Sequence, residues 1–250
     1  MRRFTSLTII VAAVLGLVAC QPSNPAIKTP DKTSDTGTTG STTPETKQEV
    51  PANLKHEGYQ YYGLDVKSEQ TYDFDLNGSK RQGMQKETYL GLSDGKPRFS
   101  IERAEALSNL GTDVVEVRDD GVYMISSREQ TLETPMLALP AKMEIGKSWE
   151  ITEKLKDING NEVTLKASNK IDGQEKVTTS AGTFDCLAVS MTGTLVTQGK
   201  TQKVTGKTWY AAGTGTVKLT VSTNGADGKP TNYTITLSKP SGDTKASPSE

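Results

Sequence analysis

The sequence predicts an all-β domain, an antiparallel meander that forms an open barrel or a sandwich-like curved sheet, behind a disordered N-terminal tether. Apolar residues recur at every second position, turn dipeptides follow about every ten residues, and no long segment has helical periodicity. The segment Tyr72 to Leu76, YDFDL, shows the pattern, since apolar and acidic side chains alternate before Asn77-Gly78. These observations indicate strands joined by tight turns.

The same alternation predicts further strands along the chain. It places turns at Asp119-Asp120-Gly121, Asn159-Gly160, Asp172-Gly173, Ala181-Gly182, Gln198-Gly199 and Asn224-Gly225. One segment departs from the pattern. Ser100 to Gly111, SIERAEALSNLG, has apolar residues at helical spacing with Gly at its end, and it predicts a short helix.

The N-terminus has the architecture of an export signal. Arg2 and Arg3 precede an apolar run from Leu7 to Ala19, and the chain turns polar after Cys20. The alternative is a transmembrane anchor. As a helix, however, this run would rise only about 20 Å, well short of the roughly 30 Å hydrocarbon core. We therefore expect a signal peptide over residues 1–19.

Leu17-Val18-Ala19-Cys20 resembles the lipobox of bacterial lipoproteins. The resemblance implies that Cys20 carries diacylglycerol and fatty acyl chains such as palmitate, and that the chain is cleaved before it. The expected partner is therefore a membrane of the cell envelope, reached through the acylated N-terminus. Gln21 resembles the signal for the outer membrane, if the cell is Gram-negative.

Composition divides the rest of the chain. Residues 20–58 contain the segment DKTSDTGTTGSTTPETKQE and are predicted to be a flexible linker, because too little apolar surface is available to bury. Residues 59–238 are predicted to form a single β domain, and residues 239–250 a disordered tail. The 29 basic and 30 acidic residues are interspersed. No basic stripe with aromatic residues indicates a nucleic-acid partner.

Few residues are candidates for catalysis or for metal binding. His56 is the only histidine and lies at the edge of the linker, which argues against multi-histidine zinc sites and against Ser-His-Asp catalysis. We expect it to be a solvated boundary residue. Cys186 has no partner once Cys20 is acylated, and its apolar neighbours predict a buried, inert thiol. We predict no catalytic residue, no cofactor and no metal ligand.

A calcium loop is the main alternative to the hairpin at Asp73. Asp73, Asp75 and Asn77 fit the first half of an EF-hand loop, but the twelfth position is Met84 instead of a bidentate acid. Asn77-Gly78 suits a type I′ turn, so the hairpin is favoured. The segment DINGNE, Asp157 to Glu162, is interpreted in the same way. Weak, millimolar cation binding at either turn stays open.

Three tyrosines, Tyr59, Tyr61 and Tyr62, are clustered in the segment GYQYYGL. Clustered aromatic side chains can line a ligand site or a partner surface. The simpler interpretation is a first strand that packs its rings on the domain. We expect the strand.

A series of motifs in the second half resembles the exported bacterial family called TapB-like, over about residues 139–221. The motifs are Leu139-Pro140, Gly146-Lys147-Ser148-Trp149, Ala181-Gly182-Thr183-Phe184 and Trp209-Tyr210-Ala211-Ala212-Gly213-Thr214-Gly215-Thr216-Val217. The resemblance implies an antiparallel, strongly curved sheet and no enzymatic activity. Gly213 and Gly215 also suit a bulge or a corner without any resemblance.

The functional expectation is an envelope lipoprotein that is not an enzyme and that binds or scaffolds an unknown ligand or protein. A curved sheet offers a concave face, and an apolar face of this kind commonly receives a hydrophobic ligand. The alternative is an envelope-polymer hydrolase with a carboxylate pair about 5 to 9 Å apart. An apolar cavity would favour the carrier, and a filled core would favour the scaffold.

Overall fold

The computed structural model describes residues 49–156, 160–224 and 230–239. Two short 3-10 helices, η1 (Ala52–Leu54) and η2 (Ser108–Leu110), and one α-helix, α1 (Glu57–Tyr62), accompany the strands. The strands are β1 (Gln70–Leu76), β2 (Ser79–Ser93), β3 (Lys96–Glu105), β4 (Asp113–Arg118), β5 (Gly121–Ser127), β6 (Gln130–Pro140), β7 (Ser148–Lys156), β8 (Glu162–Thr179), β9 (Gly182–Thr197), β10 (Lys200–Ala211), β11 (Gly215–Asn224) and β12 (Pro230–Ser238).

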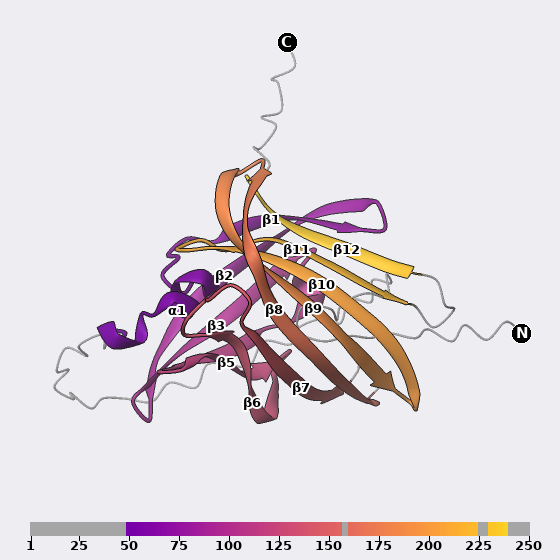
Figure 1. The fold of residues 1–250 in the computed structure, drawn as a ribbon, viewed down its shortest axis with the longest axis horizontal. Coiled ribbons are helices and arrows are strands. Elements are labelled where there is room, and N and C mark those ends of the chain that lie inside the picture. Colours follow the sequence, from indigo (N-terminus) through magenta and orange to yellow (C-terminus); the bar gives the residue numbers. More distant parts are fainter. Residues whose placement is uncertain (1–48, 157–159, 225–229, 240–250) are drawn as a thin grey trace, which may run out of the picture.

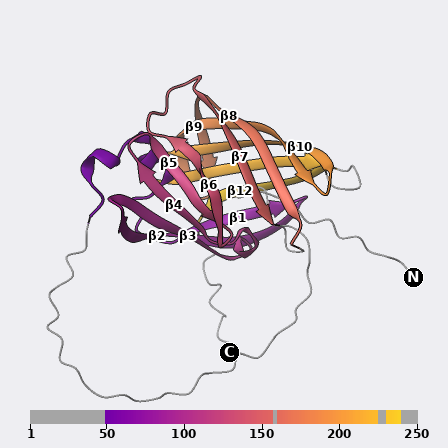
Figure 2. The ribbon, with the colours of Figure 1, turned by 90° about the horizontal axis from the view of Figure 1, so that it is seen from below.

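All twelve strands belong to one antiparallel sheet, in the order β6-β5-β4-β3-β2-β1-β12-β11-β10-β9-β8-β7. The sheet therefore consists of two meanders, β1 to β6 and β7 to β12, which are joined where β1 pairs with β12. The sheet curves strongly and nearly closes on itself (Figures 1 and 2). Its two edge strands, β6 and β7, follow one another in the chain.

The curvature has local causes in the strand pairings. The register shifts between Tyr89 and Gly91 on β2, and again between Ile171 and Gly173 on β8. A bulge of this kind bends its strand and increases the twist of the sheet. Long strands such as β8 can therefore bend across the barrel without a break in the chain.

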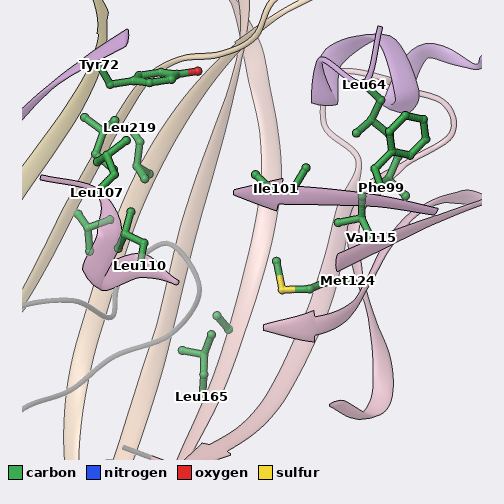
Figure 3. Packing of buried hydrophobic residues seen from close by; sticks show 14 of the residues in the cluster. Leu64, Tyr72, Phe99, Ile101, Leu107, Leu110, Val115, Met124, Leu165 and Leu219 are labelled. Atoms are coloured by element: carbon green, nitrogen blue, oxygen red, sulfur yellow. The ribbon is translucent and has the colours of Figure 1, made fainter. Parts of the chain in front are cut away.

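Alternation along the strands places the apolar side chains inside the barrel. On β11, Val217, Leu219 and Val221 are buried, while the residues between them are partly exposed. Figure 3 shows side chains from β1, β3, β4, β5, β8 and β11, together with η2, around this common interior. The predicted all-β class and the curved antiparallel sheet are confirmed.

The short helix α1 lies at one end of the curved sheet (Figure 1). The Gly58 N–H donates to the Ala141 carbonyl oxygen at 3.2 Å, and the Gly213 N–H donates to the Gln60 carbonyl oxygen at 2.9 Å. Gly63 ends the helix in a left-handed conformation and lies against Gly215, so that a Cβ on Gly63 would be 2.8 Å from the Gly215 Cα. The helix is thus tied to both halves of the barrel.

The predicted hairpin at Asn77-Gly78 is confirmed. Leu76 pairs with Ser79 across a two-residue loop, and both loop residues have positive φ, 48° and 91°, as a type I′ turn requires. The Asp75 carboxylate is not simply solvated, because its Oδ1 accepts a hydrogen bond from the Gly78 N–H at 2.7 Å. The acid stabilises the turn.

Three predictions of local structure are wrong. Residues 100–111 do not form one helix: residues 100–105 belong to β3, because Phe99 and Ile101 are buried at the spacing of a strand, and only Ser108–Leu110 is helical, as the 3-10 helix η2. The segment that contains Tyr59 to Tyr62 is helix α1 instead of a first strand. Asp172-Gly173 is a bulge within β8 instead of a turn.

The predicted boundary of the β domain at residue 59 falls inside α1. The folded chain begins earlier, because η1 and α1 bury Leu54 and Tyr59 against the barrel. Several other predictions concern residues outside the described ranges, namely the signal peptide, Cys20, the linker as far as residue 48, and the centres of the DINGNE and Asn224-Gly225 turns. Within the described ranges, no helix has the length and apolar character needed to cross a membrane.

Candidate binding cavity inside the barrel

The barrel encloses a cavity of about 180 Å³. Strands from both meanders and helices α1 and η2 contribute to its wall. Most of the lining side chains are apolar, among them Ile101, Met124, Met136, Ile151, Leu219 and Ile235. The interior is therefore neither completely filled by side chains nor polar, and an apolar group could be bound there.

One buried ion pair interrupts the apolar lining. Arg103 on β3 donates from Nη1 to Asp113 Oδ2 at 2.8 Å and to the Gly111 carbonyl oxygen at 3.1 Å, and from Nε to Gln85 Oε1 at 3.1 Å. The Asp113 side chain is fully buried, and burial raises the pKa of its carboxyl while the Arg103 guanidinium acts in the opposite direction. The cavity wall thus contains one cation and one anion that compensate each other.

Tyrosine hydroxyls add polar groups to the wall. The Tyr72 hydroxyl lies 3.0 Å from Gln70 Oε1 and 3.1 Å from the Thr216 carbonyl oxygen. Burial raises the pKa of Tyr210 to about 12, so its hydroxyl stays protonated at neutral pH. Of the clustered tyrosines, Tyr62 lines the cavity, whereas Tyr59 packs edge-on against the Phe99 ring with the centroids 6.0 Å apart.

A second pocket, of about 400 Å³, lies along the seam between β6 and β7. These two edge strands are not paired with each other in the described sheet. Instead, the seam is joined near both ends. Trp149 Nε1 donates to the Leu137 carbonyl oxygen at 3.1 Å, and the Gln130 side chain exchanges two hydrogen bonds with the Lys156 backbone. Met136, Leu137 and Ile151 line both pockets, so the inner cavity adjoins the seam.

Glu153 on β7 lines the seam pocket. Its side chain is 3% exposed, and neither of its carboxyl oxygens has a hydrogen-bond partner among the described residues. Burial raises the pKa of Glu153 to about 7, and the nearby Asp113 carboxylate adds to this effect. A buried carboxyl without a partner reduces stability, so an additional role for this residue would explain its presence.

His56 and Cys186, which the sequence offered as candidates for chemistry, lie outside this cavity. His56 caps helix α1, because its Nδ1 accepts from the Tyr59 N–H at 3.1 Å and its Nε2 lies 3.0 Å from the Arg118 carbonyl oxygen. It is therefore a partly buried residue with a structural role, and not simply a solvated one. Cys186 on β9 is buried as predicted, and burial raises the pKa of its thiol to about 11.

Acidic residues are not arranged for metal binding or for paired carboxyl chemistry in the inner cavity. The described residues contain no cluster of three or more His, Cys, Asp or Glu side chains that could hold a metal ion. Asp113 is the single carboxyl among the described residues that line the cavity, and it already forms an ion pair with Arg103.

Residues 109–225 match the DUF3108-like family model. The matched region is just under half of the chain and runs from η2 to the end of β11, so it includes Asp113, both edges of the seam and Glu153. It overlaps the motifs that resemble the TapB-like family, which stays a resemblance. No curated protein matches the sequence.

Three solved structures match part of this chain. A protein from Bacteroides fragilis with a YmcC-like fold, proposed to be exported, has a TM-score of 0.49 and 17% identity, over 68% of this chain and 95% of that one. A proposed lipoprotein from Parabacteroides distasonis has a TM-score of 0.48 and 16% identity, over 71% and 98%. The hypothetical lipoprotein YmcC from Escherichia coli has a TM-score of 0.35 and 12% identity, over 73% and 90%.

Sequence reasoning missed the three charged residues inside the barrel. Arg103 continues the inward alternation of Phe99 and Ile101, and Glu153 continues that of Trp149 and Ile151. The signal in the sequence was a charged residue at a position where the strand alternation predicts an inward-facing, apolar side chain.

Proposed function

We propose that this protein is a lipid-anchored lipoprotein of the bacterial cell envelope, and that its β domain binds a hydrophobic ligand inside the barrel without catalysing a reaction. The observation that carries the proposal is the apolar cavity, which adjoins an unpaired seam in the barrel wall. Binding sites for small molecules are typically concave and mostly apolar, with few polar groups, and this cavity has those features.

The anchor follows from the N-terminal sequence. The apolar run that ends in Leu17-Val18-Ala19-Cys20 supports export and acylation of Cys20, and the polar linker after it lets the β domain stand clear of the lipid surface. A carrier in this position could exchange a hydrophobic molecule with the membrane to which it is attached. In a Gram-negative cell, Gln21 supports the outer membrane as that location.

The geometry favours the carrier over the envelope-polymer hydrolase. A hydrolase of the usual kind needs two carboxyl groups that flank its substrate, one of them able to donate a proton. The described lining of the inner cavity offers Asp113 alone, and the Arg103 guanidinium already binds it; the other carboxyls, those of Glu133, Glu150 and Glu153, line the adjoining seam pocket. The cavity is also too apolar to bind a polysaccharide well, because sugar hydroxyls would lose hydrogen bonds to water.

Ligand binding is tested with an environment-sensitive hydrophobic dye and the full mature chain carrying Cys20→Ser, which keeps the tether and the β domain but needs no detergent. The matched variants are Thr208→Trp, which fills the inner cavity, and Thr205→Trp, which is on the outer face of the same strand. Dye binding should fall at least about tenfold in Thr208→Trp and stay unchanged in Thr205→Trp. Equal binding by both variants, provided that both are folded, would contradict the carrier.

The anchor is tested separately by cell fractionation. The wild-type chain should be recovered with membranes, and Cys20→Ser should be recovered in the soluble fraction, because Cys20 supplies the thiol that carries the lipid. Recovery of Cys20→Ser with membranes would contradict the lipoprotein assignment and leave the cavity result unaffected.

A further inference from the structure

We infer that the ligand is an amphipathic amine, whose ammonium group binds Glu153 in the seam between β6 and β7 while its apolar chain lies in the inner cavity. This inference rests on the proposed function, since it identifies the class of molecule that the cavity binds. The positions of the two pockets, the state of Glu153 and the charges around the seam support it.

The two pockets provide one continuous path for an elongated molecule. The inner cavity of about 180 Å³ is smaller than most ligand sites, which span roughly 300–1,000 Å³, but the seam pocket of about 400 Å³ adjoins it at Met136, Leu137 and Ile151. Elsewhere in the described sheet each strand is paired with its neighbours. A ligand that fills the cavity would therefore extend toward the seam.

Glu153 lies where the polar end of such a ligand would be placed. Both Glu153 oxygens are buried and no described residue lies in hydrogen-bonding geometry with them, although the nearby Ser127 hydroxyl acts to lower the pKa of the carboxyl. Asp113, by contrast, accepts from Arg103 and from the Arg128 N–H at 3.3 Å. Glu153 therefore has free acceptor capacity on both oxygens at the seam, whereas Glu87, whose Oε2 is also buried without a partner among the described residues, accepts from Gln85 through Oε1 and lines neither pocket.

The charges around the seam favour a cation over an anion. Glu133, Glu150, Glu153 and Lys154 line the seam pocket, so acids outnumber bases there. Inside the barrel, Arg103 is already neutralised by Asp113 and cannot compensate Glu153 as well. A carboxylate or phosphate head group would meet like charge, whereas an ammonium would supply the missing counter-ion.

The protonation of Glu153 suits reversible binding. Because burial raises its pKa to about 7, the carboxyl is partly neutral at neutral pH when no cation is present. An arriving ammonium favours the ionised form, and the ion pair gains strength because the Glu153 side chain is buried from water. Ionisation and binding are therefore coupled at this residue.

The test compares three probes with the same apolar chain, namely decylamine, decanol and decanoate, each below the concentration at which it aggregates. Displacement of the bound dye gives their affinities for the full mature chain carrying Cys20→Ser. Decylamine should bind at least about tenfold more tightly than decanoate, because hydrogen bonds to charged groups are among the stronger ones. Decanol should lie between the two.

The decisive variant is Glu153→Gln, with Glu162→Gln as its control, because Glu162 is an exposed acid on the adjacent strand β8 and lines neither pocket. Glu153→Gln should reduce decylamine affinity to about the affinity for decanol, and should leave decanol binding unchanged. Glu162→Gln should change neither affinity. Decanoate binding as tightly as decylamine, or a preference for decylamine that persists in Glu153→Gln, would overturn the inference while the carrier survives. If none of the probes displaces the dye, the proposed function fails as well.

Discussion

Arg103 and Asp113 form an ion pair inside the barrel, with Nη1 of Arg103 2.8 Å from Oδ2 of Asp113 and side-chain exposures of 10% and 0%. The two residues come from adjacent strands, β3 and β4, where Ile101 is paired with Asp113. Taking both charges out of water is costly, and each residue therefore depends on the other. Removing one partner leaves an uncompensated buried charge.

Arg103→Met should lower the free energy of unfolding by about 3–5 kcal/mol, because it leaves Asp113 buried without its counter-ion. Replacing both residues, as in Arg103→Met with Asp113→Leu, should restore much of the loss. Urea denaturation measures each effect. Lys176→Met provides the control, since the Lys176–Asp185 pair is exposed and should contribute less than about 1 kcal/mol. Equal losses in Arg103→Met and Lys176→Met would contradict this account.

Glu153 should make the protein less stable as pH rises. Burial raises its folded-state pKa to about 7, so between about pH 4.5 and 7 the folded state keeps a proton that the unfolded state has lost. The unfolding free energy therefore falls across this window and then levels off. Glu153→Gln should remove this loss, and at pH 8 it should be more stable than wild type by about 2–3 kcal/mol.

Urea denaturation of Glu153→Gln and wild type at pH 5 and pH 8 provides the measurement. Glu150→Gln is the control, because its exposed side chain on the same strand should leave the difference between the two pH values as it is in wild type. Parallel pH profiles for Glu153→Gln and wild type would show that the Glu153 carboxyl is not the source of the effect.

The turn at Asn77-Gly78 should depend on backbone conformation and not on calcium. Gly78→Ala should lower the unfolding free energy by about 1 kcal/mol or more, because Gly78 has a φ of 91°, where a Cβ is strained. Asp75→Ala should cost a similar amount, about 1 kcal/mol, through the lost hydrogen bond to the Gly78 N–H. Thermal melting should not change between about 1 mM calcium and chelator. A calcium-dependent rise that disappears in Asp73→Ala with Asp75→Ala would restore the metal interpretation.

Helix α1 should detach from the barrel when Gly63 gains a side chain. Gly63 and Gly213 both have positive φ, so Ala at either position should cost about 1 kcal/mol through strain. Only Gly63→Ala adds a steric conflict, because its Cβ would lie 2.8 Å from the Gly215 Cα, whereas nothing lies within 4 Å of a Cβ on Gly213. Gly63→Ala should therefore melt lower than Gly213→Ala, and amide exchange in α1 should be faster. Equal melting of the two variants would argue against close packing of the helix.

Cys186 should react slowly with thiol reagents while the protein is folded. Its side chain is 1% exposed, and burial raises the thiol pKa to about 11, so the reactive thiolate is scarce at neutral pH. Labelling should become fast only in denaturant. Rapid labelling of the native protein at pH 7 would indicate a reactive site.

Local features of this chain could be predicted from sequence because their causes are local. Alternation from Tyr72 to Leu76 selects the face of β1, and Asn-Gly at residues 77 and 78 closes a hairpin through backbone conformations that few other residue pairs adopt. Both signals depend on near neighbours only. The fold class follows from repeating such signals along the chain.

The incorrect predictions arose where the tertiary structure decides between local alternatives. Residues 100–111 have apolar residues that suit either a helix or a strand, and pairing of β3 with β2 and β4 selects the strand. Asp172-Gly173 has the composition of a turn, yet β8 continues through it because β9 pairs with both sides of the bulge. At both places, pairing with the neighbouring strands outweighs the local preference of the residues for a helix or a turn.

The sequence by itself determined the alternation, the tight turns and the buried character of Cys186, since each depends on residues close together in the chain. Only the tertiary structure decided that β1 pairs with β12, that β6 and β7 meet without pairing, and that Arg103, Asp113 and Glu153 face one interior. These relationships depend on how far a sheet of twelve strands twists and curves before its edges meet. The position at which the edges meet depends on the twist and curvature added by every strand pairing and every bulge. No short segment of the sequence determines it.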